Sequence, residues 1–171
     1  MITYIALGVA VLLIGADQLV KYWAMTSLAE IGTIPLIGNV FHLTYVENRG
    51  AAFGMLQGQK WILVGVTSLV LLGAVIFLLS GRVKNRVFIW AIALIIAGGV
   101  GNLIDRIARG FVVDYFDFRL INFYVFNLAD TCVCVGVGLV LLYLLVLEPR
   151  EQKRKALASK KVDDGGLSEQ K

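Results

Sequence analysis

Four segments of this 171-residue chain are long and apolar enough to cross a lipid bilayer. An α-helix rises about 1.5 Å per residue, so about 20 residues span a hydrocarbon core of about 30 Å. Apolar residues make up 58% of the chain, above the roughly 45–50% of a typical soluble domain. We therefore predict an integral membrane protein, an all-α bundle of four transmembrane helices at residues 2–23, 61–80, 87–107 and 126–147.

The distribution of basic residues predicts the orientation of the four segments. The short link 80–86 carries three basic residues and the stretch after residue 147 several more, whereas the longer link 24–60 has two. Basic residues accumulate on the cytoplasmic side of membrane proteins. We therefore expect both termini to be cytoplasmic, with the links 24–60 and 108–125 on the outer side.

Residues 1–150 are expected to form a single membrane domain. The first segment lacks the basic n-region and small-residue cleavage site of a signal peptide, so we expect it to be retained. Residues 151–171 are charged and poor in large apolar side chains. Such a composition does not support a packed core, and we expect a disordered tail.

Both outer links show the alternation of a β-strand. "NVFHLTYVENRGAAF" alternates from Phe41 and is expected to turn at residues 47–50, and "GFVVDYFDFRLINFYVF" is strand-like and rich in aromatic residues. Aromatic side chains favour the interface between lipid and water. We predict a small extracytoplasmic β-rich cradle or lid, mainly between the first and second spans, against the outer ends of the helices.

Ionisable residues within spans are costly and tend to form pairs or to mark a function. Asp17 and Lys21 are four residues apart, so they share a helix face and can form an ion pair. Asn102, Asp105 and Arg106 likewise share a face near the outer end of the third span. A structural role is favoured for the first pair, and the second group fits packing and a functional site equally well.

Asp130 lies about one turn inside the fourth span, where removing a carboxylate from water costs free energy and its presence therefore requires an explanation. Asn127 can cap the helix, with Asp130 as the returning partner of a capping box. An amide would cap without the desolvation cost of an acid. Asp114, in the preceding outer link, offers a second carboxylate on the same side of the membrane.

Two carboxylates in a poorly hydrated site share a proton, so that one is a base while the other is an acid near neutral pH. Such a pair suits peptide hydrolysis by an activated water. Asp117 is a rival partner for Asp130, but strand alternation directs it to the face opposite Asp114.

Other chemistries find less support in the sequence. There is no GxSxG or HExxH motif, His42 is the single histidine, and Cys132 and Cys134 are too few for a zinc site and are interpreted as small helix side chains. We expect no metal, no cofactor and no nucleic-acid partner. A proton- or ion-coupled transporter and a structural or lipid-binding scaffold stay open as rival classes, although the acidic residues cluster on one side of the membrane.

Four motifs, in order along nearly the whole chain, resemble the bacterial lipoprotein signal peptidase family (signal peptidase II). They are "DQLVKYW", "ENRGAAFG", "GNLIDRIARGFVVDYFD" and "FNLAD". The resemblance implies a four-span aspartic protease of the bacterial cytoplasmic membrane with its active site near the extracytoplasmic face. Its substrates would be prolipoproteins that carry diacylglyceryl on a cysteine, cut just before that cysteine, with membrane lipids as further partners.

The resemblance also implies roles for individual residues. Asp114 and Asp130 match the two catalytic carboxylates, and Tyr115 stands where many members have Phe. The polar residues that match those around the catalytic pair and on the substrate backbone are Asn48, Asn102, Arg106 and Asn127. Those that match structural supports of the site are Asp17, Lys21 and Asp105. A lid that moves over the bound peptide is expected too, and a crosslink from Ala52 to the third span would test it.

Overall fold

A computed structural model describes residues 1–50, 58–154 and 157 of the chain. Ala52, and with it the expected movement of a lid, lies outside these residues. In chain order the main helices are α1 (Ile2–Trp23), α3 (Lys60–Leu79), α4 (Arg86–Ala108) and α5 (Leu128–Leu142). Short helices are η1 (Ala24–Leu28), α2 (Ala29–Ile31), η3 (Arg119–Ile121) and η4 (Tyr143–Leu147), and the strands are β1 (Thr33–Ile37), β2 (Phe41–Asn48) and β3 (Val112–Phe118).

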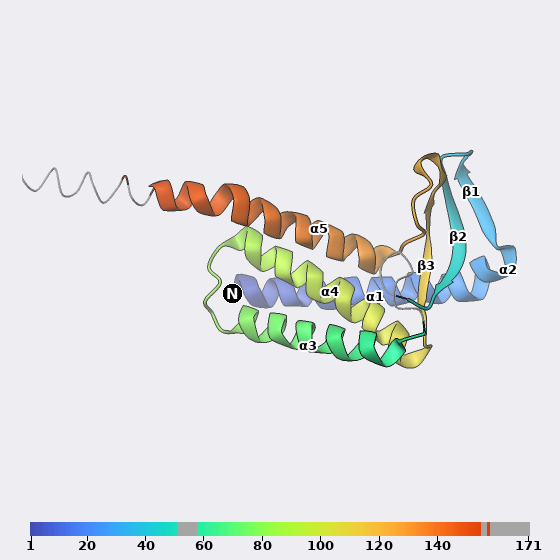
Figure 1. Ribbon diagram of the computed structural model, residues 1–171, viewed down its shortest axis with the longest axis horizontal. Helices are drawn as coiled ribbons and strands as arrows, with labels where there is room; N and C mark the ends of the chain where they lie inside the picture. The colour runs from blue at the N-terminus through green and yellow to red at the C-terminus, as the bar shows by residue number, and fades with distance from the viewer. Residues whose placement is uncertain (51–57, 155–156, 158–171) are drawn as a thin grey trace, which may run out of the picture.

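The predicted four-helix bundle is confirmed, because the described residues contain four helices with the length and hydropathy of membrane spans. The helices lie side by side, and the sheet crosses one end of the bundle (Figure 1). The N-terminus and the link between α3 and α4 lie at the opposite end. Large apolar side chains such as Trp61 and Leu69 are exposed on α3, which is the surface that lipid tails would cover.

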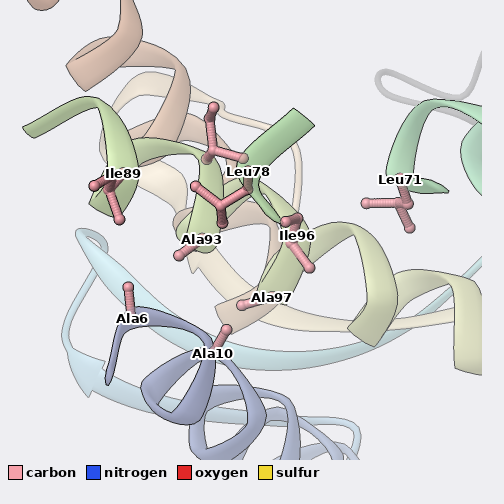
Figure 2. Packing of buried hydrophobic residues seen from close by; sticks show 9 residues of the cluster. Ala6, Ala10, Leu71, Leu78, Ile89, Ala93, Ile96 and Ala97 are labelled. Carbon is pink, nitrogen blue, oxygen red and sulfur yellow. The ribbon is translucent and has the colours of Figure 1, made fainter. Parts of the chain in front are cut away.

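Helix α4 forms the centre of the bundle. In α4, half of the residues in the apolar stretch that is long enough to cross a membrane are buried, against 11% in the corresponding stretch of α3. Small residues allow this close packing: Figure 2 shows Ala93 and Ala97 of α4 facing Ala6 and Ala10 of α1, with Leu78 of α3 closing the cluster. Small side chains at helix interfaces let backbones approach, which favours association within a bilayer.

Two helices extend beyond the predicted spans. The first continues through η1 and α2 to Ile31, where Gly32 ends it with a positive φ of 81°. Ala24 and Leu28 in this extension are fully buried against the sheet. This contact with the sheet stabilises the extra turns, and a prediction from apolar content alone does not detect it and therefore ended the helix at residue 23. The fourth helix continues to Arg154, four residues into the segment predicted as a tail, most of which lies outside the described residues.

The β-rich region forms an antiparallel sheet of three strands in the described chain, in the order β1-β2-β3. The predicted strands from Phe41 and around Asp114 correspond to β2 and β3. Strand β1 was not predicted, because its short sequence contains Pro35, which suits an edge strand but weakens any strand signal. A register shift between Leu43 and Val46 on β2 brings Val46 opposite Asp114.

A glycine pair on α5 tests the close approach of α4 and α5. A Cβ at Gly136 would lie 2.7 Å from the backbone oxygen of Ala91, whereas a Cβ at Gly138 would meet nothing within 4 Å. We expect Gly136→Ala to lower the free energy of unfolding by about 1–3 kcal/mol through overpacking. Gly138→Ala should leave it unchanged or raise it by up to about 1 kcal/mol through helix propensity.

The measurement is reversible unfolding of each variant in the same detergent micelles. Equal stability of the two alanine variants would contradict the packing of α4 against α5.

Candidate active site

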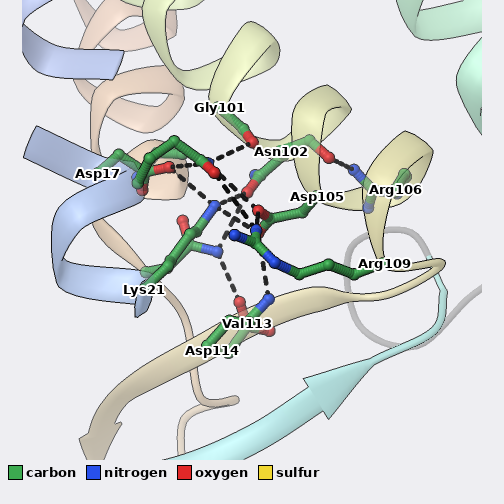
Figure 3. Close-up of polar contacts among 12 residues, drawn as sticks. Asp17, Lys21, Gly101, Asn102, Asp105, Arg106, Arg109, Val113 and Asp114 are labelled. Atoms are coloured by element: carbon green, nitrogen blue, oxygen red, sulfur yellow. Dashed lines mark hydrogen bonds and ion pairs between the residues drawn. The ribbon is translucent and has the colours of Figure 1, made fainter. Parts of the chain in front are cut away.

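A buried polar cluster lies where the sheet meets the ends of the helices (Figure 3). Helices α1, α4 and α5 and strands β2 and β3 contribute its side chains. The structure brings all nine predicted site residues into one network of hydrogen bonds and ion pairs. They are Asp17, Lys21, Asn48, Asn102, Asp105, Arg106, Asp114, Asn127 and Asp130.

Lys21 is the central cation of the cluster and is completely buried. Its Nζ lies 2.9 Å from Asp17 Oδ2, 2.9 Å from Asp105 Oδ2 and 2.8 Å from Asn102 Oδ1. An ammonium group has three N–H donors, so each of them has an acceptor. The ion pair predicted from the four-residue spacing of Asp17 and Lys21 is confirmed.

Asp17 joins α1 to the start of α5. Its Oδ1 accepts a hydrogen bond from the backbone N–H of Ala129 at 3.0 Å, and a negative charge is favourable at a helix N-terminus. Gly101 of α4 leaves room for this contact, since a Cβ there would lie 2.7 Å from Asp17 Oδ2. Gly101 therefore allows α1 and α4 to approach closely at this point.

Asp105 joins α4 to β3 in a similar way. Its Oδ2 accepts from the backbone N–H of Val113 at 3.3 Å, and its Oδ1 accepts from Gln18 and from the guanidinium of Arg109. Asp17 and Asp105 are thus balanced by Lys21 and Arg109. This balance accounts for burying both carboxylates, since an unpaired buried charge is strongly destabilising.

Asn127 contacts both of the remaining carboxylates. Its Nδ2 donates to Asp114 Oδ1 at 2.6 Å, and its backbone N–H donates to Asp130 Oδ2 at 3.2 Å. Its Oδ1 accepts from the backbone N–H of Asp130 at 2.8 Å, which completes the predicted capping box. Asn127 therefore caps α5 and also connects the two acidic side chains, Asp114 and Asp130.

Two further amides hold the outer oxygens of the pair. Asn102 Nδ2 donates to Asp130 Oδ1 at 2.7 Å, and Asn48 Nδ2 donates to Asp114 Oδ2 at 3.1 Å. Every oxygen of Asp114 and Asp130 thus has a neutral N–H donor. Such donors fix the orientation of a carboxyl group without adding the full charge that would force both groups to ionise.

The pKa of Asp114 is raised from 3.8 to about 7. Burial is the largest cause and the negative charge of Asp130 the second, while hydrogen bonds from Asn48 and Asn127 oppose the shift. A carboxyl group with this pKa is present in both protonation states near neutral pH, as a general acid or base requires.

Arg106 ties the end of α4 to the end of β2. Its Nη2 donates to the backbone oxygen of Gly50 at 2.9 Å, and its positive charge attracts both Asp114 and Asp130. Asn48 Oδ1 accepts from the backbone N–H of Gly50 at 3.0 Å. Gly50, two residues after β2, is thus held close to the acidic pair.

Asp117 lies apart from the cluster, as strand alternation predicts. Its Oδ2 accepts from Thr44 Oγ1 at 2.7 Å and from Arg119 Nε at 2.9 Å. The two cysteines are free, with Cys132 buried and Cys134 exposed, in agreement with their interpretation as helix side chains. Within the described residues, no three His, Cys, Asp or Glu side chains are grouped as a metal site requires.

The predictions from the sequence missed three residues that contact the cluster: Gln18, Arg109 and Tyr115. Gln18 donates to Asp17, Asp105 and the backbone of Gly101. Its position three residues before Lys21, like that of Arg109 four after Asp105, is a helical spacing that could have revealed it. Tyr115 left no such signal, because its hydroxyl accepts from the backbone N–H of Leu128 across two elements, at 3.1 Å.

Comparison with known proteins connects this cluster to one family. The family described as "Signal peptidase (SPase) II" matches residues 9–146. The lipoprotein signal peptidase of Clostridioides difficile (strain 630) is 51% identical over 147 residues, which cover 84% of this chain and 97% of that protein. The lipoprotein signal peptidase of Halalkalibacterium halodurans is 44% identical over 158 residues, covering 91% and 99%.

Solved structures agree with the sequence relatives. One, described as a bacterial membrane enzyme, superimposes with a TM-score of 0.77 at 34% identity, covering 82% of this chain and 87% of the other. A second structure with the same description gives a TM-score of 0.74 at 33% identity. Each of the two superpositions covers 82% of this chain.

Removing the central cation should destabilise the protein strongly. We expect Lys21→Met to lower the free energy of unfolding by about 3–5 kcal/mol, because it leaves Asp17 and Asp105 buried without their shared partner. The measurement is unfolding of the variant in detergent micelles.

Arg49→Met is the matched control, because it removes the cation of the exposed pair with Glu47. An exposed pair contributes less than about 1 kcal/mol. A loss for Lys21→Met as small as that of the control would contradict the central role of Lys21.

The raised pKa of Asp114 predicts how stability depends on pH. Because the folded state binds this proton more tightly than the unfolded state, the stabilisation is complete below about pH 4 and is lost as pH rises through about 7. Asp114→Asn should therefore flatten the decline between about pH 5 and 8 and be more stable than the wild type at pH 8. The melting temperature measured across this pH range checks the prediction.

Asp117→Asn is the control for this measurement. Burial alone would raise the pKa of Asp117, but hydrogen bonds from Thr44 and Arg119 outweigh burial and the pKa is lowered. The titration of Asp117 therefore changes the stability only below about pH 4, outside the range of about pH 5 to 8 in which Asp114 is tested. An unchanged slope in Asp114→Asn would contradict the raised pKa.

Proposed function

The chain belongs to the signal peptidase II family of lipoprotein signal peptidases, and we propose that Asp114 and Asp130 are its catalytic pair. As a member of this family it is an aspartic protease of the membrane that removes signal peptides from prolipoproteins. The observation that supports the assignment is the contact of Asn127 with both carboxyl groups, at 2.6 Å and 3.2 Å.

In the proposed reaction the two carboxyl groups share one proton. The ionised group takes a proton from a water molecule, whose oxygen attacks the carbonyl carbon of the scissile peptide bond. The protonated group donates its proton to the carbonyl oxygen, and the pair keeps one proton in total. Collapse of the tetrahedral intermediate then breaks the C–N bond as the proton of the pair passes to the leaving nitrogen. One hydroxyl of the intermediate returns its proton to the pair as the new carboxyl group forms, so the pair again holds one proton.

The surrounding amides have a positioning role in this proposal. Asn48, Asn102 and Asn127 hold the four carboxyl oxygens in a fixed arrangement, so little reorganisation is needed when the proton moves. Arg106 adds a positive charge that interacts with the negative charge of the acidic pair. Asp17, Lys21 and Asp105 act behind this layer by joining α1, α4 and α5.

The proposed orientation places the sheet outside the cell and the link between α3 and α4 in the cytoplasm. Basic residues in the link and after residue 147 support it. A prolipoprotein whose cysteine carries diacylglyceryl is held at headgroup depth by its acyl chains. Carboxyl groups at the sheet end of the bundle would meet its peptide bond at that depth, with membrane lipids surrounding the entry.

Separate replacement of the two acids tests the assignment. We expect Asp114→Asn and Asp130→Asn each to lower kcat by about 10²–10⁴-fold, because each removes a proton-transfer group. Both variants should keep or raise the melting temperature by a few degrees, because each removes one charge of a repelling pair. The readout is cleavage of a purified, diacylglyceryl-modified precursor in detergent.

Asp117→Asn provides the control, since this acid bonds to Thr44 and Arg119 and lies outside the cluster. It should keep kcat within about twofold of the wild type. Near wild-type turnover in either of the other variants would rule out the acidic pair as the catalytic group.

A further inference from the structure

A second site lies at the end of the bundle opposite the sheet. The link between α3 and α4 and the far end of the fourth helix enclose a cavity of about 450 Å³, lined by Arg82, Lys84, Asn85, Arg86, Tyr143 and Glu151. A second cavity of about 240 Å³ shares Arg82, Lys84, Asn85 and Tyr143 with the first. The two cavities therefore form one groove. Neither Asp114 nor Asp130 lines it.

The first part of the groove is strongly basic. Arg82, Lys84 and Arg86 have exposed side chains, and within the described residues none of them forms an ion pair with a carboxylate. Glu151 also lines this cavity, and its Oε1 accepts from Asn85 Nδ2 at 2.8 Å instead of pairing with one of the three cations. Three cations without carboxylate partners are thus available to one anionic group.

Beyond the residues that it shares with the first part, the second part of the groove is lined by apolar and aromatic side chains and by one acidic residue, Glu148. Phe77, Phe88 and Leu144 line it next to Tyr143. The rings of Phe88 and Tyr143 lie 4.8 Å apart, and those of Phe77 and Phe88 lie 6.4 Å apart edge to face. This wall joins the link 80–86 to the interior of the spans, where acyl chains begin.

We propose that this groove binds one anionic phospholipid, with its phosphate at Arg82, Lys84 and Arg86 and its acyl chains along the aromatic wall. A basic groove between transmembrane helices matches an acidic headgroup, and the adjoining apolar wall matches a chain that a free phosphate lacks. Bound lipid would join the link 80–86 to the fourth helix. The site is independent of the catalytic pair and does not rest on the proposed function.

The test uses the full-length protein in a neutral detergent and native mass spectrometry. Phosphatidylglycerol and phosphatidylcholine with identical acyl chains are titrated, and the fraction of protein carrying one lipid gives each Kd. We expect phosphatidylglycerol to bind at least tenfold more tightly. Glycerol 3-phosphate, which has the anionic group without chains, should not displace it at millimolar concentration.

A charge-matched pair of variants locates the site. A basic residue near an anionic lipid contributes a factor of about five in affinity, so Arg82→Gln with Lys84→Gln should weaken phosphatidylglycerol binding about thirtyfold. Arg150→Gln with Lys153→Gln removes two charges from the same end of the protein but from outside the groove, and should change Kd by less than about twofold. If the first double variant does not fold, the single variants should each lose about fivefold.

Three results would overturn the proposal: equal affinity for the two lipids, an equal loss in both double variants, or displacement by glycerol 3-phosphate. The first would exclude charge recognition, the second would indicate diffuse attraction to the basic end of the protein, and the third would indicate a site for any phosphate.

Discussion

The buried ammonium of Lys21 is the interaction on which the rest of the site depends. It bonds to Asp17 on its own helix and to Asn102 and Asp105 on α4. Asp17 in turn holds the start of α5, and Asp105 holds the start of β3. The four elements α1, α4, β3 and α5 are therefore joined through a single cation, which explains how a polar site can be held in place at the end of an apolar bundle.

Rigidity and reactivity are separated within this cluster. Asp17 and Asp105 are neutralised by direct contact with Lys21 and Arg109, whereas Asp114 and Asp130 receive neutral N–H donors. Direct ion pairs favour the ionised form of an acid, and neutral amides leave it more able to hold a proton in a buried site. Two pairs of aspartates in one cluster can thus serve as fixed supports and as exchangeable acids.

Local periodicity carried most of what could be predicted. The spacing of Asp17 and Lys21 predicted the ion pair, and that of Asn127 and Asp130 predicted the capping box, because both contacts lie within one or two helical turns. Contacts between distant elements left weaker traces. The hydrogen bond from Leu128 to Tyr115 and the burial of Leu28 against the sheet depend on how the elements pack. Such packing cannot be predicted from the spacing of residues along the chain.

The neighbouring positions of Asp17 and Lys21 on one helix also bear on how the chain enters the membrane during synthesis. The first span emerges from the ribosome long before α4 exists, so at that moment Asp105 and Asn102 are not available to Lys21. A carboxylate one turn away lets the span insert as a pair without net charge. When α4 follows, Asn102 and Asp105 supply the two further acceptors of the ammonium, so the contacts of Lys21 can form in the order in which the helices are translated.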